Sequence, residues 1–337
     1  MAPPLLDSFN RPLWDLRISV TDRCNHRCVF CMPKEKKYHF LPRKDLLSFE
    51  EIFRISRILV SMGIRKIRLT GGEPLLRKHL ENLICQLKEL KKEGLKEIAL
   101  TTNGIFLSQK AKILKEAGLD RITASLHSLD KTLFQNITGS AHSTPHQVIE
   151  GLKSAKEAGL TPIKINFVPL RSLNDQEILE VARFCRQEGF ILRFIEYMDV
   201  GTVNPWSLEK VLSGKEILEI LGREFPLKPL EPQYRGEVAK RYLYEDGKGE
   251  IGLITSISSP FCGDCTRLRL GADGKLYTCL FAGKGLDIRE PLREGANDKE
   301  LERLIASLWQ KRKDRYSEER WEEKEKREKK EMFQMGG

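Results

Sequence analysis

The chain has 337 residues, enough for one large domain or for a domain with an appendage, and 40% of them are hydrophobic. No run approaches the roughly 18 apolar residues of a membrane span, and the start lacks the basic and apolar stretches of a secretory signal. We therefore expect a cytoplasmic protein without a membrane partner. The net charge of +10 favours an anionic partner, either nucleic acid or a phosphorylated small molecule.

A strand is predicted at residues 16–21, where apolar and polar side chains alternate. A loop with three cysteines follows it directly: Cys24, Cys28 and Cys31. Zinc normally takes four protein ligands at structural sites, whereas iron–sulfur clusters are held by thiolates. Three thiolates alone therefore indicate a cubane cluster with one iron open to a small molecule. A zinc loop completed by His26 or His39, or a set of thiols without metal, remains the alternative.

Helical stretches that end at glycine and restart as strands recur through the first two hundred residues. The glycines at these junctions are Gly63, Gly94, Gly118, Gly159 and Gly189. Glycine after a helix adopts the left-handed conformation that ends it, and the spacing is typical of strand–helix units with a parallel sheet. Six units fall short of a complete eightfold barrel. We predict an α/β protein, a partial (β/α)6 TIM-like barrel whose active site lies at the C-terminal ends of the strands.

Cations alternate with apolar residues along several of these strands. The polar members that share a face within each strand are Arg17, Ser19 and Thr21; Lys66, Arg68 and Thr70; Lys164 and Asn166; and Arg193. On any single strand they could point to solvent, but in a barrel covered by helices we expect them to point inward. Like charges about 8 Å apart repel by roughly 2 kcal/mol at an effective dielectric of about 20. Such a lumen requires an anion of several charges, and a triphosphate fits.

The last third of the chain contains a Pro-rich connector and a second set of cysteines. We place the boundary between a domain of residues 1–222 and a C-terminal region of residues 223–337. The second set again has three members: Cys262, Cys265 and Cys279. No cysteine or histidine follows it, so this metal site too has a position open to a non-protein ligand. Arg267 and Arg269 alternate on a short predicted strand beside it, residues 311–330 are predicted to be a solvated helix, and the final diglycine is by default a flexible end.

Several of these motifs resemble known signatures. Cys24-x3-Cys28-x2-Cys31, with an aromatic residue before the last cysteine, resembles the radical S-adenosylmethionine enzymes, and the Gly-Gly-Glu-Pro run at 71–74 resembles their amine-binding loop. Four further features restrict the resemblance to one family within this superfamily. They are residues 17–24, residues 193–198, the second cysteine set with its two arginines, and the terminal diglycine. Together they resemble the GTP 3′,8-cyclase family of molybdenum cofactor biosynthesis over nearly the whole chain.

The resemblance implies two four-iron four-sulfur clusters, with the second held in the C-terminal extension. It assigns the first to Cys24, Cys28 and Cys31 and the second to Cys262, Cys265 and Cys279. S-adenosylmethionine would bind the open iron of the first cluster and contact Phe30, Gly72, Ser125 and Met198. GTP would contact Arg17, Lys66, Arg68, Thr101, Lys164, Arg193, Arg267, Leu268 and Arg269. The terminal Gly336 and Gly337 would reach into the active site as catalytic residues.

The implied reaction removes the ribose 3′ hydrogen of GTP, joins C3′ to C8 of guanine and reduces the product to a 3′,8-cyclo-7,8-dihydro nucleotide. Cyclic pyranopterin monophosphate synthase would act next, the electron donor is unknown, no nucleic acid is involved, and a homodimer is left open. Two positions depart from the family pattern. Phe30 replaces a frequent tyrosine, and His127 replaces the usual aspartate, which puts the polar contacts at the end of the fourth strand in question.

Two rival functions fit parts of the pattern. A peptide maturase of the same superfamily would also carry an auxiliary cluster, but it usually has more C-terminal cysteines and has less reason for a basic lumen. A zinc-stabilised nucleic-acid-binding protein would suit the net charge of +10, but it would carry basic and aromatic stretches on its surface. Here many of the cations fall in strands that we expect to be buried.

Overall fold

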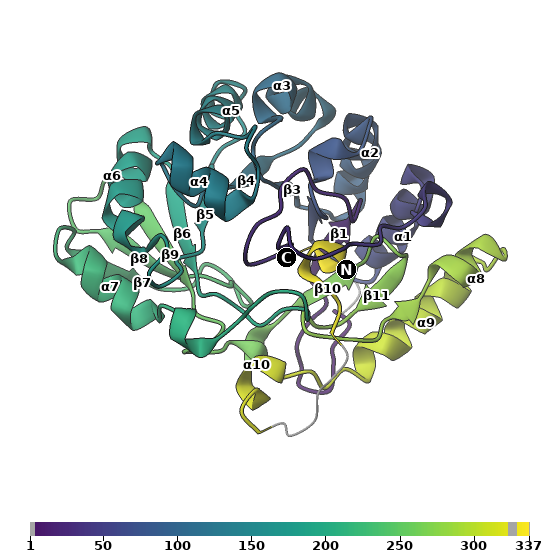
Figure 1. Cartoon of the computed structure of the whole chain (residues 1–337). Helices are drawn as coiled ribbons and strands as arrows, with labels where there is room; N and C mark the ends of the chain where they lie inside the picture. The colour runs from purple at the N-terminus through teal and green to yellow at the C-terminus, as the bar shows by residue number, and fades with distance from the viewer. Residues whose placement is uncertain (1–3, 323–328, 337) are drawn as a thin grey trace.

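The computed structural model describes residues 4–322 and 329–336. Six parallel strands line the inside of an arc of helices, as Figure 1 shows. The strands are β1 (Asp15–Ser19), β2 (Lys66–Thr70), β3 (Glu97–Thr102), β4 (Arg121–Ser125), β5 (Lys164–Phe167) and β6 (Ile191–Ile195). The helices between and after them are α1 (Phe49–Ser61), α2 (Leu80–Glu89), α3 (Leu107–Ala117), α4 (Lys131–Thr138), α5 (Pro145–Glu157) and α6 (Ile178–Glu188). The predicted six-unit partial barrel is confirmed.

The remaining elements comprise one helix that ends at residue 222 and the strands and helices of residues 223–337. They are α7 (Gly214–Gly222), β7 (Leu227–Leu230), β8 (Lys240–Tyr244), β9 (Glu250–Ile254), β10 (Arg267–Leu270), β11 (Lys275–Tyr277), β12 (Leu286–Asp287), α8 (Arg289–Arg293), α9 (Asp298–Gln310), α10 (Tyr316–Glu319) and α11 (Met332–Met335). Short 3-10 helices lie at Arg43–Asp45, Pro74–Leu76, Leu90–Glu93, Asp175–Glu177, Leu208–Lys210 and Cys262–Asp264.

The strands of the C-terminal region extend the barrel sheet at both edges. Within the described residues the strand order is β12-β11-β10-β1-β2-β3-β4-β5-β6-β9-β8-β7. Strand β10 pairs in parallel with β1, and β9 pairs in parallel with β6. The segment that carries the second cysteine set therefore runs into a strand that lies directly beside β1. Sequence separation hides this neighbourhood, because β1 and β10 are about 250 residues apart in the chain.

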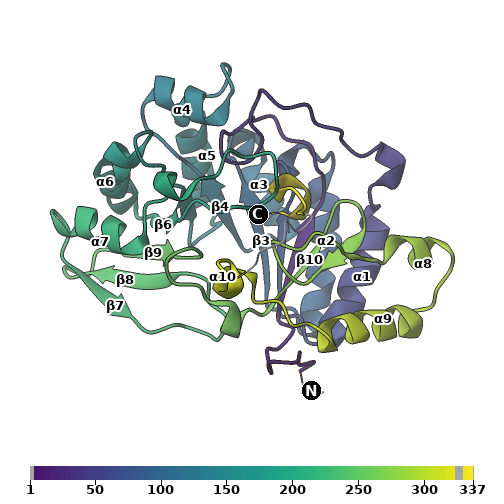
Figure 2. The ribbon, with the colours of Figure 1, turned by 60° about the horizontal axis from the view of Figure 1, so that its bottom comes forward.

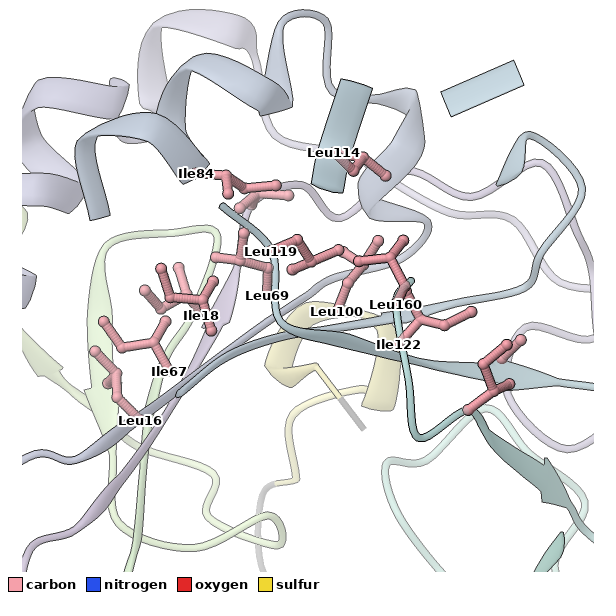
Figure 3. Packing of buried hydrophobic residues seen from close by; sticks show 14 of the residues in the cluster. Leu16, Ile18, Ile67, Leu69, Ile84, Leu100, Leu114, Leu119, Ile122 and Leu160 are labelled. Carbon is pink, nitrogen blue, oxygen red and sulfur yellow. The ribbon is translucent and has the colours of Figure 1, made fainter. Parts of the chain in front are cut away.

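The two faces of the sheet have opposite character. Leu16, Ile18, Ile67, Leu69 and Leu100 are buried in the main hydrophobic core. Figure 3 shows them packed between the strands and the outer helices. Each buried aliphatic side chain of this kind contributes roughly 1.5–3 kcal/mol to folding. Because strand side chains alternate, the intervening polar residues face away from the helices and into the barrel.

Local sequence signals set the ends of the helices. Ser48 and Glu51 form a capping box at the start of α1. All five glycines that were predicted to end helices have positive φ, as at Gly118 (111°) and Gly189 (73°). No helix in the described ranges is long and apolar enough to cross a membrane.

The prediction of one solvated helix over residues 311–330 is wrong for the part of it that the structure describes. Helix α9 ends at Gln310, and only the short α10 follows before residue 323. Arg312 and Arg320 are 4% and 8% exposed. The high density of charge hid the fact that these arginines turn inward. Figure 2 shows α10 beside the opening of the barrel.

Candidate active site

The first cysteine loop follows β1 and folds into a tight turn. The backbone N–H groups of Cys31 and Met32 both donate to the Cys28 carbonyl, at 3.0 and 2.8 Å. The Arg27 guanidinium donates to the Cys24 carbonyl at 2.8 Å. All three thiols line a cavity of about 180 Å³, which we call the first cavity.

The surroundings of this loop fit a thiolate-held cluster. His26 directs Nε2 to the Ser143 hydroxyl at 3.0 Å, and His39 is exposed. Burial, together with the charge of Glu73, raises the pKa of the Cys24 thiol to about 11. Buried thiols of this kind become thiolates when a metal supplies positive charge, and thiolates are the ligands that iron–sulfur clusters take.

Two glycines let the loop after β2 pack against the cysteine loop. A Cβ on Gly71 would lie 2.3 Å from the Thr21 carbonyl oxygen, and one on Gly72 would lie 2.3 Å from that of Arg23. The Gly72 N–H donates to the Thr21 carbonyl at 2.8 Å. Any side chain at either glycine would therefore push the loops apart.

All four predicted cofactor contacts line the first cavity: Phe30, Gly72, Ser125 and Met198. His127 lines it as well, with its ring centroid 4.9 Å from that of Phe30. Its Nδ1 accepts the Val168 backbone N–H at 3.1 Å, which places the ring proton on Nε2. Burial lowers the pKa of His127 to about 3, so the ring is neutral. A neutral ring thus stands where the family usually has an aspartate, and one of its two nitrogens, Nδ1, already has a hydrogen-bond partner.

The second cysteine set lines a neighbouring cavity of about 160 Å³, which we call the second cavity. One of its cysteines, Cys265, is contacted by two arginines. Arg267 Nε and Nη2 lie 3.3 and 3.1 Å from Cys265 Sγ, and Arg312 Nη2 lies 3.1 Å from the same atom. Burial alone would raise the pKa of the Cys265 thiol, but the charges of Arg267 and Arg312 outweigh it and lower that pKa to about 6. The sulfur of Cys265 thus receives hydrogen bonds suited to a thiolate, whereas burial raises the pKa of the Cys262 and Cys279 thiols.

Seven cationic residues and one threonine that were predicted to bind substrate meet in the second cavity. They are Arg17, Lys66, Arg68, Thr101, Lys164, Arg193, Arg267 and Arg269. Strand register places Arg269, Arg17 and Arg68 side by side on three neighbouring strands. Burial and the neighbouring cations lower the pKa of Lys66 and of Lys164 to about 8 and that of Arg193 to about 9. These positive charges destabilise one another until an anion joins them.

Several guanidinium N–H groups in this cavity have no hydrogen-bond partner among the described residues. They are Arg121 Nη1, Arg193 Nε, Arg269 Nε and Arg269 Nη1. A buried donor left unpaired costs about 1–3 kcal/mol, and more when it is charged. A polyanionic ligand would satisfy both these donors and the net charge. Leu268 differs from its neighbours, because its side chain is fully buried in the hydrophobic core and only its backbone could contact a ligand.

The two cavities adjoin and form one chamber. Four residues line both of them: Thr101, Asn166, Ile195 and Met198. Asn166 accepts a hydrogen bond of 2.7 Å from Arg193 Nη2. The chamber therefore carries one cysteine triad in each part, with cations concentrated in the part that holds the second triad.

The end of the chain returns to the barrel, as Figures 1 and 2 show. Met332 and Phe333 line the first cavity. A Cβ on Gly336 would lie 2.2 Å from Thr70 Cγ2 and 3.1 Å from Ser19 Oγ. The flexible-end alternative is thus wrong for Gly336, whereas Gly337 lies outside the described residues.

Two cations of the second cavity were missed at the sequence level. Arg121 lines the cavity and pairs with Glu97 at 2.7 Å. Its signal was present, because Arg121, Thr123 and Ser125 alternate as the polar residues of β1 do. Arg312 was hidden in a run of mixed charges that carries no periodic pattern.

Comparison with known sequences gives consistent matches along the chain. Residues 18–185 match the Radical SAM superfamily, and residues 190–318 match the family Molybdenum Cofactor Synthesis C. The chain is 50% identical over 333 residues to a GTP 3′,8-cyclase of Aquifex aeolicus, covering 99% of this chain and 100% of that protein. It is 48% identical over 325 residues to a GTP 3′,8-cyclase of Acidothermus cellulolyticus, covering 94% of this chain and 89% of that protein.

Solved structures share the fold at lower identity. Streptococcus suis SuiB bound to S-adenosylmethionine superposes with a TM-score of 0.56 and 19% identity over 80% of this chain. This chain spans 61% of SuiB, so less than two thirds of it. The structure of anSMEcpe with bound AdoMet and Cp18Cys peptide gives a TM-score of 0.55 and 16% identity, covering 86% of this chain and 82% of that one. These two likenesses establish the fold alone.

Proposed function

The chain belongs to the GTP 3′,8-cyclase family, and from that membership we propose how its own residues divide the work. It is a radical S-adenosylmethionine enzyme that converts GTP to (8S)-3′,8-cyclo-7,8-dihydroguanosine 5′-triphosphate, the first step of molybdenum cofactor biosynthesis. It uses S-adenosylmethionine and an iron–sulfur cluster. The assignment of residues rests on one observation: a single chamber holds a cysteine triad in each part and unpaired buried guanidinium groups in one part.

The first cavity is the cofactor half. Cys24, Cys28 and Cys31 would hold the first four-iron cluster. When bound, that cluster and S-adenosylmethionine would supply the radical chemistry that removes a hydrogen atom from the ribose of GTP. Gly72 gives the cofactor room because it has no side chain, Ser125 offers a hydroxyl, and Phe30 and Met198 provide apolar walls that limit access of water. Neutral His127 orients the same wall through its bond to the Val168 N–H.

The second cavity is the substrate half. Cys262, Cys265 and Cys279 would hold a second four-iron cluster, and with three protein ligands that cluster would leave one iron available to the substrate. Arg267 and Arg312 stabilise the thiolate of Cys265 through their N–H groups. The triphosphate would bind to the cations of the cavity wall, with Thr101 and Arg121 beside them. These cations are Arg17, Lys66, Arg68, Lys164, Arg193 and Arg269. Leu268 contributes its backbone alone.

The C-terminal tail completes the first cavity. Gly336 lies against Thr70 and Ser19 at the C-terminal ends of β2 and β1, where no larger residue fits. Glu331 anchors the tail, because its Oε1 accepts the N–H of Thr202 at 2.9 Å and the hydroxyl of the same residue at 2.8 Å. By the family resemblance we assign Gly336 and Gly337 to the catalytic machinery; of the two, the structure describes Gly336.

The remaining assignments concern organisation and partners. Residues 1–222 form the radical S-adenosylmethionine domain, and residues 223–337 form the auxiliary-cluster region. The product passes to cyclic pyranopterin monophosphate synthase, and a homodimer is compatible with this organisation. We place the protein in the cytoplasm, because six clustered thiols need a reducing compartment.

Anaerobic reconstitution followed by product analysis tests the proposal. The full chain should bind about eight irons, which corresponds to two four-iron clusters. With reductant, S-adenosylmethionine and GTP it should release 5′-deoxyadenosine together with a cyclised nucleotide. Zinc in place of iron would contradict the proposal. Cleavage of S-adenosylmethionine that is unaffected by adding GTP would contradict it as well.

A further inference from the structure

A buried carboxylate joins two buried arginines close to the second cysteine triad. Asp7 Oδ2 lies 2.6 Å from Arg11 Nε and 3.3 Å from Arg312 Nη1. The three residues are 5%, 0% and 4% exposed, respectively. One carboxylate thus bridges two guanidinium groups that lie 301 positions apart in sequence (312 − 11). Buried charges persist only when they are paired and hydrogen-bonded, so this cage is a built feature and not a chance surface contact.

The N-terminal part of the cage is a small turn. Asp7 Oδ1 accepts the backbone N–H groups of Phe9 and Arg11, both at 2.9 Å. Leu6 and Pro12 form an isolated antiparallel bridge at the base of the turn. Aspartate favours such turns because its side chain bonds to the backbone two residues further on. The turn therefore fixes the position of the Asp7 carboxylate through backbone N–H groups as well as through the arginines.

The two arginines of the cage hold the backbone of two cysteines. Arg11 Nη1 donates to the Cys262 carbonyl at 2.8 Å, and Arg312 Nη1 donates to the Cys265 carbonyl at 2.7 Å. Arg312 Nη2 donates to Cys265 Sγ itself at 3.1 Å. The Arg312 guanidinium lies over the Trp309 ring, 4.6 Å from its centroid, which fixes its plane. The start of the chain thereby positions the second triad.

The first triad has an arginine on its backbone but, within the described residues, no charged N–H donor on a sulfur: Arg27 donates to the Cys24 carbonyl at 2.8 Å. Cys24 Sγ lies 3.4 Å from the His26 backbone N–H and 4.0 Å from Asn103 Nδ2. Both of these donors are uncharged. Reduction adds negative charge to a thiolate-held cluster, so charged N–H donors at the sulfur stabilise the reduced form and raise the reduction potential. The two triads therefore hold their clusters under different electrostatic conditions.

We propose that Asp7, Arg11 and Arg312 form a positioning cage for the second cluster, and that the N–H···S bond from Arg312 raises the reduction potential of that cluster. This inference rests on the proposed second cluster at Cys262, Cys265 and Cys279. Arg312 acts through Cys265 and is a positioning residue.

Redox titration of the reconstituted full-length enzyme, followed by electron paramagnetic resonance, measures the effect. The signals of the two clusters are assigned by which one changes on adding GTP and which one changes on adding S-adenosylmethionine. Arg312→Gln removes the charge, whereas Arg312→Lys keeps the charge and loses the planar fork. Asp7→Asn loosens the cage without touching a cysteine. Arg320→Gln is the matched control, because Arg320 is a buried arginine of the same segment that pairs with Asp199.

Arg312→Gln should lower the midpoint potential of the second cluster and leave that of the first unchanged. Arg312→Lys and Asp7→Asn should lower it by less, and Arg320→Gln should not lower it. If Arg312→Gln loses the second cluster, Arg312→Lys still reports the shift. An unchanged potential in Arg312→Gln and Arg312→Lys, or an equal shift in Arg320→Gln, would overturn the inference. Wild-type enzyme with only about four irons would instead refute the proposed second cluster.

Discussion

The two cysteine triads offer the same number of thiols, but, within the described residues, only the second has a thiol, Cys265, whose sulfur accepts hydrogen bonds from arginines. Burial and the charge of Glu73 raise the pKa of Cys24 in the first triad. In the second triad, Arg267 and Arg312 lower the pKa of Cys265. The comparison teaches that three cysteines determine that a cluster can bind, whereas the side chains around them determine what each half of the chamber does. The neutral half suits a sulfonium cofactor, and the cationic half suits a triphosphate.

The largest expected effect separates the two triads directly. Cys28→Ala should abolish both 5′-deoxyadenosine and the cyclised nucleotide, because it breaks the cofactor half. Cys265→Ala should abolish the cyclised nucleotide and keep formation of 5′-deoxyadenosine. Chromatography of both products measures the outcome, and iron analysis should give about four irons for each variant. A Cys265→Ala enzyme that still makes the cyclised nucleotide would show that the two halves do not divide the work.

The tail offers the next largest effect. Gly336→Ala would place a Cβ 2.2 Å from Thr70 Cγ2, and overpacking of this kind costs about 1–3 kcal/mol. We expect the tail to be displaced and the cyclised nucleotide to fall by about 10- to 100-fold, since each 1.4 kcal/mol is about tenfold. Both clusters should remain, as judged by iron content.

Gly295→Ala is the matched control for the tail. Gly295 also has positive φ (95°), but nothing lies within 4 Å of a Cβ built there. This variant carries the same kind of backbone strain far from the chamber, so product formation should be unchanged. Equal losses in both variants would assign the effect of Gly336→Ala to general strain.

In the cationic half, rising pH should weaken GTP binding and increase the stability of the ligand-free protein. Burial lowers the pKa of Lys66 and Lys164 to about 8, below the ordinary lysine value of about 10.4. As pH rises from 7 to 9 these lysines lose charge in the free enzyme, so the Kd for GTP should rise, by about 2- to 10-fold. Between about pH 8 and 10 the unfolded chain binds more protons than the folded one, so stability of the ligand-free protein should increase.

Calorimetric titration with GTP and thermal melts at each pH measure the two trends. Lys164→Arg keeps its charge more strongly over this range and should flatten the rise in Kd. A Kd for GTP that stays constant from pH 7 to 9 in wild type would contradict the assignment of these lysines to the triphosphate.

Features that depend on residues close together in the sequence could be predicted, whereas features that depend on residues far apart could not. Arg17, Lys66 and Lys164 were predicted to face inward because alternation within one strand is a local signal and six repeated units imply which face is covered. Arg121 carried the same signal and was overlooked. The cage of Asp7, Arg11 and Arg312 could not be predicted, because its partners lie at opposite ends of the chain and neither end has a periodic pattern.

The parallel pairing of β10 with β1 escaped prediction for a similar reason. The sequence of the segment Arg267–Leu270 does not indicate which barrel strand it pairs with. The pairing brings Arg269 into register with Arg17. The second triad therefore enters the chamber through tertiary pairing and not through any motif of its own.

The smallest expected effect is on binding of S-adenosylmethionine and concerns His127 in the cofactor half. His127→Asn keeps an oxygen that can accept the Val168 N–H, so the loss should be about 0.5 kcal/mol, or about twofold in the Kd for S-adenosylmethionine. The Kd for GTP should not change. Because burial lowers the pKa of His127 to about 3, the ring stays neutral from pH 6 to 8. Wild type and His127→Asn should therefore have the same pH profile for cofactor binding over that range. A profile that changes near pH 6.5 only in wild type would show a charged His127, and the neutral character of this half would be refuted.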